Sequence, residues 1–207
     1  LHENHQIEPE MSLLCDLSYQ NNQVTSIRPR FAMAHNDCSI RREGALKISE
    51  KKNWGTESKG SAVQKIEIDC FAPGGVLDNY RLTSFLVRKG VLHDYGVDSP
   101  VSAYSYFYQE LLDWLVDRMN HQEDHGPLEN IAAWLKIAGY PNQALISVGA
   151  TRYTNFGAQN FLQPGDRSIV VLYDPEKYDL SELRKRAQDT KPPKEAGLSI
   201  LNQSVYI

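Results

Sequence analysis

The sequence predicts an α+β fold in which a mixed or antiparallel sheet carries an antiparallel helix pair on one face. Three observations support this prediction. Apolar residues recur at steps of three and four between residues 103 and 139, which is the period of a helix. Residues 63–71 alternate between apolar and polar, which is the period of a strand. Residues 168–173 form a short apolar run, which is typical of a central strand.

The helix pair has the clearest sequence pattern in the chain. We expect the first helix to begin near Ser99-Pro100, because Ser favours the N-cap and Pro the first helical position. The second helix is expected to begin at Gly126-Pro127 and to end at Gly139. Because the link between the helices is short, the sequence predicts that they pack antiparallel.

The segment before the helix pair is predicted to be rich in strands. Residues 1–11 are polar and are expected to be poorly ordered, which leaves residues 12–207 as a single globular domain. The elements predicted here are strands at 13–17, 30–34, 45–49 and 63–71, a mobile loop at 51–61 and a helix at 79–89.

The segment after the helix pair alternates strands with loops and one helix. Asp179 and Glu182 have the spacing of a capping box, with Asp in the Ser/Thr position, and predict a helix start. The elements predicted here are strands at 144–148, 168–173 and 198–207, an irregular stretch at 151–163 and a helix at 179–187.

Composition narrows the class of partner. The 207 residues carry a formal net charge of −4, and the sequence pI is about 5.9. A nucleic-acid-binding surface usually shows as a high pI and a basic patch, and the basic residues at 184–191 fit a solvated helix face instead. A protein partner or self-association is therefore favoured over nucleic acid.

Cysteine usage and hydropathy suggest a soluble protein of a reducing compartment, such as the cytoplasm. Cys15, Cys38 and Cys70 are odd in number and widely spaced, which is neither a disulfide framework nor a zinc-knuckle pattern. No apolar run is long enough for a transmembrane helix, and the first residues lack a signal-peptide layout. Since the chain begins without Met, we expect a processed product or a fragment.

The first candidate for chemistry is the run His121-Gln122-Glu123-Asp124-His125. On a helix, His121 and His125 would share a face and could bind one zinc ion, with Asp124 as a base. The catalytic spellings of this motif carry Glu, and Gly126 and Pro127 end the helix at this point. The alternative is a polar helix terminus whose histidines face the C-terminal dipole.

The second candidate resembles the arrangement in metal-dependent nucleases of the restriction-endonuclease type. Asp37 precedes Glu50 and Lys52, which would share one face of a strand. In this arrangement the two acids hold a divalent ion and the lysine helps to polarise the attacking water. The alternative is a surface turn followed by a charged strand end.

Two cysteines are candidates for a nucleophile. Cys70 could be activated by His93 and Asp94, although its place in the alternating strand favours a core position. Cys38 lies beside His35 in an expected turn, where it would be exposed.

The irregular segment 149–160 is a further candidate, because loops carried by rigid strands often bind ligands. Arg152, Tyr153 and Asn155 could contact a polar or anionic group there. A purely structural loop is the alternative.

No sequence signature decides the function. The chain lacks the common dinucleotide, P-loop, hydrolase-elbow and zincin motifs, and no cofactor can be assigned. Its 11 tyrosines suit an interface. We therefore expect an interaction or assembly domain that binds a macromolecular partner, and we keep as the alternative a hydrolase or transferase that uses one of the candidate sites above.

Overall fold

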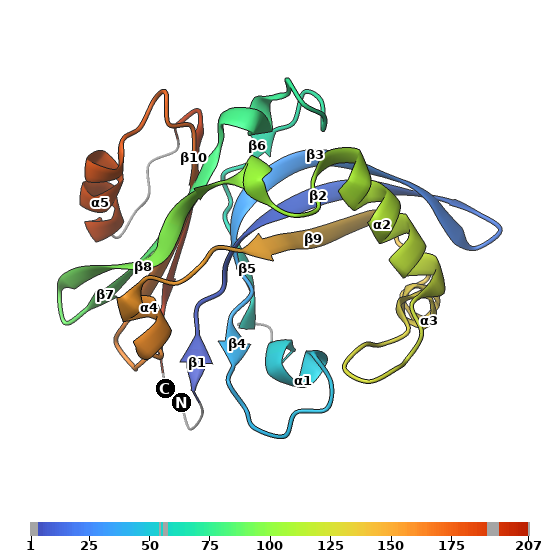
Figure 1. The fold of residues 1–207 in the computed structure, drawn as a ribbon, viewed down its shortest axis with the longest axis horizontal. Helices are drawn as coiled ribbons and strands as arrows, with labels where there is room; N and C mark the ends of the chain where they lie inside the picture. The colour runs from blue at the N-terminus through green and yellow to red at the C-terminus, as the bar shows by residue number, and fades with distance from the viewer. Residues whose placement is uncertain (1–3, 54, 56–57, 190–194, 207) are drawn as a thin grey trace.

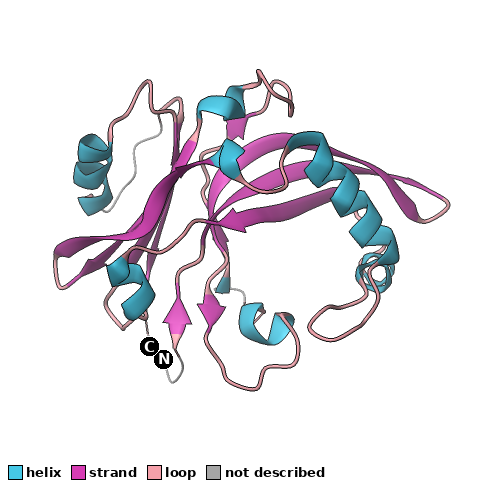
Figure 2. Ribbon diagram, viewed as in Figure 1, coloured by secondary structure: helices cyan, strands magenta, loops and turns pink. Residues whose placement is uncertain are grey.

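The structure of the protein is a computed structural model that describes residues 4–53, 55, 58–189 and 195–206. Within these residues the fold is α+β and rich in strands, which form three antiparallel sheets (Figures 1 and 2). The prediction of a mixed or antiparallel sheet is thus confirmed, and every strand pair among the described residues is antiparallel.

A five-stranded sheet is built around the two longest strands. Its order is β5-β3-β2-β9, and β6 also pairs with β3. The strands are β2 (Pro9–Gln20), β3 (Gln23–Asn36), β5 (Gly60–Ser61), β6 (Ile66–Glu67) and β9 (Gln143–Ala150). A tight turn at Asn21 and Asn22, both with positive φ, joins β2 to β3, which suits asparagine.

A four-stranded sheet follows the order β11-β10-β7-β8. Its strands are β7 (Arg81–Arg88), β8 (Val91–Pro100), β10 (Arg167–Tyr173) and β11 (Leu198–Ser204). A third, two-stranded sheet pairs β1 (His5–Gln6) with β4 (Ser39–Ile40).

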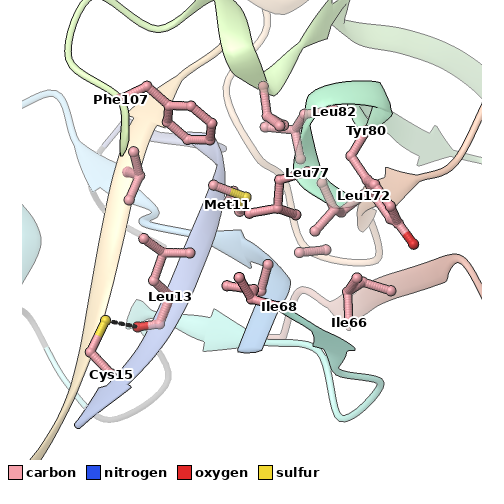
Figure 3. Packing of buried hydrophobic residues seen from close by; sticks show 14 of the residues in the cluster. Met11, Leu13, Cys15, Ile66, Ile68, Leu77, Tyr80, Leu82, Phe107 and Leu172 are labelled. Carbon is pink, nitrogen blue, oxygen red and sulfur yellow. Dashed lines mark hydrogen bonds between the residues drawn. The ribbon is translucent and has the colours of Figure 1, made fainter. Parts of the chain in front are cut away.

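The main hydrophobic core is shared by the two larger sheets (Figure 3). Met11 and Leu13 of β2 meet Leu82 of β7 and Leu172 of β10, and all four side chains are fully buried. On the other face of β10, Ile169 and its alternating neighbours pack against helix α5. The strand is therefore apolar on both faces, which explains its uninterrupted apolar run.

The helices lie at the periphery. They are α1 (Ser49–Lys52), α2 (Tyr108–His121), α3 (Ile131–Ile137), α4 (Asn155–Gln159) and α5 (Leu180–Gln188), with 3-10 turns η2 (Val76–Asn79) and η3 (Val101–Ala103). Side chains cap three of them: Asn130, Thr154 and Asp179 each accept a backbone N–H from the first turn of α3, α4 and α5.

The predicted helix pair is only partly realised. Helices α2 and α3 contact each other, and α2 packs against β3. They begin later than expected, because β8 continues through Pro100 and Asn130 caps α3. A helix pair that covers one sheet face is not confirmed: α5 and the five-stranded sheet cover the two faces of the four-stranded sheet.

Several predicted elements differ from the observed ones. The stretch 79–89 is strand β7 rather than a helix, because its apolar residues pair between β10 and β8. Residues 45–49 form no strand and lead into α1, and the strand at 63–71 shrinks to β6. Strands also occupy residues 5–6 and 9–11, where poor order is expected from polarity, because they pair with β4 and β3.

No helix among the described residues is long and apolar enough to cross a membrane.

Candidate functional site: a carboxylate cluster on the five-stranded sheet

The alternation of β2 gives the five-stranded sheet one apolar and one polar face. Met11 and Leu13 point into the core, whereas Glu10 and Ser12 occupy the alternate positions. The polar face is nevertheless covered, since Glu10 is 7% exposed and Ser12 is fully buried. A buried carboxyl on a sheet face is costly unless something compensates its charge.

Three carboxylates converge on this face. The pairing of β2 with β3 sets Glu10 opposite His35, so Asp37 comes next to Glu8, whose carbonyl oxygen accepts its backbone N–H at 3.1 Å. One carboxylate oxygen from each of Glu8, Glu10 and Asp37 lies within 4.8 Å of the others. This spacing is short enough for the three groups to share one metal ion.

Basic side chains surround two of the three carboxylates. The Lys52 ammonium bridges Glu8 and Asp37, with 2.7 Å to Oδ2 of Asp37. Lys59 binds the other oxygen of Asp37, and Arg41 binds the other oxygen of Glu8 at 2.8 Å. All four oxygens of these two carboxylates are therefore paired with a cation.

Glu10 differs from its two neighbours. Among the described residues, no lysine or arginine forms a salt bridge with it, and Ser147 of β9 supplies its side-chain hydrogen bond. Burial, reinforced by the charge of Asp37, raises the pKa of Glu10 to about 7. Burial alone would also raise the pKa of Asp37, but hydrogen bonds from Lys52 and Lys59 bring it below its usual value.

A polar chain adjoins the cluster on the same face. His35 Nδ1 lies 2.7 Å from the Ser61 hydroxyl, which is 3.1 Å from the Ser12 hydroxyl. Burial lowers the pKa of His35 to about 4, and the charge of Asp37 only partly offsets this. At neutral pH the imidazole is therefore uncharged, and its ring nitrogen can accept a hydrogen bond from the Ser61 hydroxyl.

We expect the Glu10→Gln variant to be more stable than the wild type at about pH 8 in the presence of a chelator. Folded Glu10 keeps its proton up to about pH 7, whereas the unfolded group loses it near 4.5. Folding takes up a proton between these values, so wild-type stability falls as the pH rises through this window. The difference in unfolding free energy should approach zero near pH 4.5 and reach up to about 3 kcal/mol above pH 7.

Denaturant unfolding of both proteins across this pH range checks the prediction. Comparing the variant with the wild type cancels the opposite effect of His35, whose lowered pKa makes stability rise with pH. Glu110→Gln on the exposed surface of α2 makes the same chemical change as a control. A difference that stays constant across the window would contradict the assigned environment of Glu10.

The histidines of the first sequence candidate do not share a helical face. Helix α2 ends at His121, and Gln122 has an extended backbone, which breaks the i, i+4 relation to His125. His121 binds Asp117 at 2.9 Å, and Asp124 pairs with Lys47 instead of the histidines. The zinc site that the sequence predicts at His121, Asp124 and His125 requires one continuous helix, and α2 ends before the last two of these residues.

The three residues of the second sequence candidate, Asp37, Glu50 and Lys52, do not come together at one site. Asp37 and Lys52 meet in the carboxylate cluster. Glu50 points elsewhere and accepts the backbone N–H groups of Leu46 and Lys47. The reason is local: the segment forms helix α1 instead of a strand, so Glu50 and Lys52 do not share a face.

The cysteine environments are the reverse of those predicted. Cys70 is exposed, because β6 ends at Glu67, before the alternation reaches it. Cys38 is buried beside the cluster, and burial raises its pKa to about 12, which makes it a poor nucleophile. Cys15 is also buried.

The irregular segment contributes one residue near the cluster. The Tyr153 hydroxyl donates to the Ile7 carbonyl oxygen at 2.9 Å and accepts from Arg41, which in turn binds Glu8. The other two candidate residues have structural contacts instead. The backbone carbonyl oxygen of Arg152 accepts the Val97 N–H, and Asn155 is the first residue of α4.

Glu8 and Glu10 are not predicted as site residues, because the polar composition of residues 1–11 predicts poor order there. The signal is nevertheless present. Apolar side chains stand at the odd positions Ile7, Met11 and Leu13, with Glu8 and Glu10 at even positions between them. This is the alternation of a strand with one polar face.

Comparisons with known proteins identify the family but give no activity. No curated protein matches the chain. A solved 2-keto-3-deoxyarabinonate dehydratase is similar at 14% identity and a TM-score of 0.46, over 82% of this chain and 49% of that one. The chain thus spans about half the length of that protein. A family model described as "Family of unknown function (DUF5718)" matches residues 1–205, and the chain belongs to this family.

Proposed function

We propose that the protein is a divalent-cation-dependent enzyme, a hydrolase or a transferase, whose ion is held by Glu8, Glu10 and Asp37. The observation that supports this most strongly is the convergence of three carboxylate oxygens within 4.8 Å on a covered sheet face. Glu8 and Asp37 are paired with cations, but among the described residues Glu10 is not, and burial, reinforced by the charge of Asp37, raises its pKa, which reflects an uncompensated cost of ionising Glu10. A bound cation would offset it.

The donor set favours a hard ion. Carboxylate oxygens suit Mg²⁺ and Mn²⁺, whereas zinc sites usually include histidine or thiolate. Within the cluster all three donors are carboxylates, and the neighbouring His35 is tied to Ser61. When bound, such an ion would act as a Lewis acid and lower the pKa of water or of a substrate group.

The chain's own side chains supply the other functions that such chemistry requires. The Lys59 side chain is 39% exposed, so its ammonium lies at the rim, where it can bind an anionic substrate group and Asp37 together. Neutral His35 can accept a hydrogen bond from the Ser61 hydroxyl, 2.7 Å away, and so orient that hydroxyl. The assignment as hydrolase or transferase rests on this combination of an ion site, a cation and an oriented hydroxyl.

The first test is stabilisation by the ion. Adding millimolar Mn²⁺ or Mg²⁺ to chelator-treated protein should raise the melting temperature by about 5 °C or more, since an ion at about 100 times its Kd adds about 2.7 kcal/mol. Ca²⁺ serves as a size comparison and Na⁺ at matched ionic strength as the control. No shift with any divalent ion would remove the proposal.

The second test is turnover. Chelator-treated protein should be inactive on a panel of p-nitrophenyl carboxylic esters and phosphoesters, and Mn²⁺ should restore hydrolysis of at least one of them. Restored activity must be lost in an Asp37→Asn variant, which separates the site from a contaminant. Activity that persists in chelator would contradict a metal-dependent mechanism.

An interaction or assembly domain is the second candidate, as the sequence predicts. It is supported by the outer side of α3, where Trp134 is 56% and Ile137 is 74% exposed. Light scattering of the wild type and of a Trp134→Ser/Ile137→Ser variant tests it. A larger assembly that the variant reduces to a monomer would favour this candidate, whereas a wild-type monomer would count against self-assembly.

A further inference from the structure

Lys52 occupies the position between two of the proposed ion ligands. Its ammonium contacts Glu8 Oε2 and Asp37 Oδ2, and it also donates to the Asp37 carbonyl oxygen at 3.1 Å. A divalent ion placed between Glu8 and Asp37 would compete for the oxygens that the Lys52 ammonium bridges, since Arg41 and Lys59 hold the other two. The ammonium and the ion therefore exclude each other sterically as well as electrostatically.

Lys52 reaches the cluster from a segment that we call the strap, residues 44–53, which includes α1. The strap is attached on its far side to the loop between α2 and α3, which curls toward α1 in Figure 1. The backbone N–H of Ile48 donates to the Pro127 carbonyl oxygen at 3.0 Å. Lys47 donates to the Leu128 carbonyl oxygen at 2.7 Å, and Ser49 donates to Glu129 at 2.7 Å.

The strap has few apolar contacts that would hold it in place. Helix α1 has no buried residue, and Leu46 is 78% and Ile48 is 49% exposed. A hollow of about 520 Å³ lies between α1 and α3, lined by Ser49, Glu50, Asn53, Glu129 and Trp134. Because little apolar surface is buried, lifting the strap breaks mainly polar contacts that water can replace.

We propose that the strap is a displaceable plug, in which the Lys52 ammonium holds the carboxylates in the absence of a divalent ion. Ion binding expels Lys52 and releases the strap, which uncovers the polar face of the sheet. The loop that holds Lys47 and Ser49 sets how easily this happens. The inference rests on the proposed function, because it requires that an ion binds Glu8, Glu10 and Asp37.

Hydrogen exchange of the wild-type protein with and without Mn²⁺ tests the movement. An ion that only rigidifies its ligands slows exchange in the peptides that contain them. The plug predicts that peptides covering residues 44–53 exchange faster when Mn²⁺ is bound, while peptides of β2 exchange more slowly. This measurement needs no variant and therefore does not depend on the folding of one.

Mn²⁺ affinity, measured by titration calorimetry, tests the competition. Lys52→Met should bind Mn²⁺ at least about tenfold more tightly than the wild type, because its charge-assisted hydrogen bonds no longer have to be broken. Lys51→Met, one position earlier on α1, removes the same charge as a matched control and should leave the affinity unchanged. Lys47→Met should tighten binding about threefold, because it removes one of the attachments of the strap without changing a contact of the three cluster carboxylates.

The outcomes separate this inference from the proposed function. If neither the wild type nor Lys52→Met binds a divalent ion, the ion site and the plug both fall. If the wild type binds Mn²⁺ but Lys52→Met binds it equally or more weakly, the ion site stands and the plug is refuted. Slower exchange of the strap on ion binding refutes the plug in the same way.

Discussion

An Asp37→Asn variant is expected to bind Mn²⁺ at least about hundredfold more weakly than the wild type, because losing a ligand should cost at least as much as losing an outer-shell partner, which costs about 10–100-fold. Asp37 contacts Lys52 and Lys59, and one of its carboxylate oxygens lies within 4.8 Å of an oxygen of Glu8 and of Glu10. The amide has the same shape but no charge, so it keeps the packing and removes most of the attraction for a cation. Titration calorimetry of chelator-treated protein measures the change.

The control for this variant is Asp113→Asn on α2, whose carboxylate is exposed and accepts a hydrogen bond from Gln109. It should bind Mn²⁺ as the wild type does. If both variants bind with wild-type affinity, the ion occupies some other site, and the assignment of Glu8, Glu10 and Asp37 as ligands is incorrect.

The second large effect is expected far from this site. Arg88 at the end of β7 binds both carboxylate oxygens of Asp166, at 2.9 and 2.7 Å, and donates to the Phe161 carbonyl oxygen. The Asp166 side chain is 2% exposed and that of Arg88 is 16% exposed. Asp166→Ala should therefore lower the unfolding free energy by about 3–5 kcal/mol, because it leaves a largely buried guanidinium without its counter-charge.

Denaturant unfolding provides the measurement for this pair. Asp117→Ala is a suitable comparison, since Asp117 contacts Arg118 and His121 on the surface with its side chain 47% exposed. That variant should change stability far less, because water screens an exposed ion pair. Equal losses in the two variants would show that burial does not determine the strength of the Arg88–Asp166 pair.

Much of the fold was predictable wherever one physical signal dominated. The apolar run at 168–173 predicts β10 because that strand is buried on both faces. The Asp179 cap predicts the start of α5, since the carboxylate accepts the Glu182 N–H at 2.9 Å. Each of these signals lies within a few consecutive residues, so it can be recognised without knowing which distant segments the element packs against.

Strand β7 was not predictable in the same way. Leu82, Phe85 and Leu86 recur at helical steps, and Gly90 follows as a helix stop would. In the structure, Leu82 and Leu86 face one core and Phe85 the other, because the sheet is covered on both sides. Long-range pairing with β10 overrides the local period, and a single sequence contains no direct record of that pairing.

The site was only half predictable for a related reason. Asp37 and Lys52 belong to the nuclease-like sequence candidate, but that candidate requires a strand where α1 forms. Glu8 and Glu10 stand in a short polar segment whose order depends on pairing with residues 35–40. The convergence of these four side chains is a property of register, which composition and spacing do not reveal.

The most direct test of the central claim is a crystal structure of the protein grown with Mn²⁺, with anomalous scattering recorded near the manganese edge. The proposed ion site predicts one strong anomalous peak between the carboxylates of Glu8, Glu10 and Asp37, with the Lys52 ammonium withdrawn from the position it holds between Glu8 and Asp37. A crystal that shows no anomalous peak at these carboxylates, or a peak elsewhere with Lys52 still in place, would contradict it.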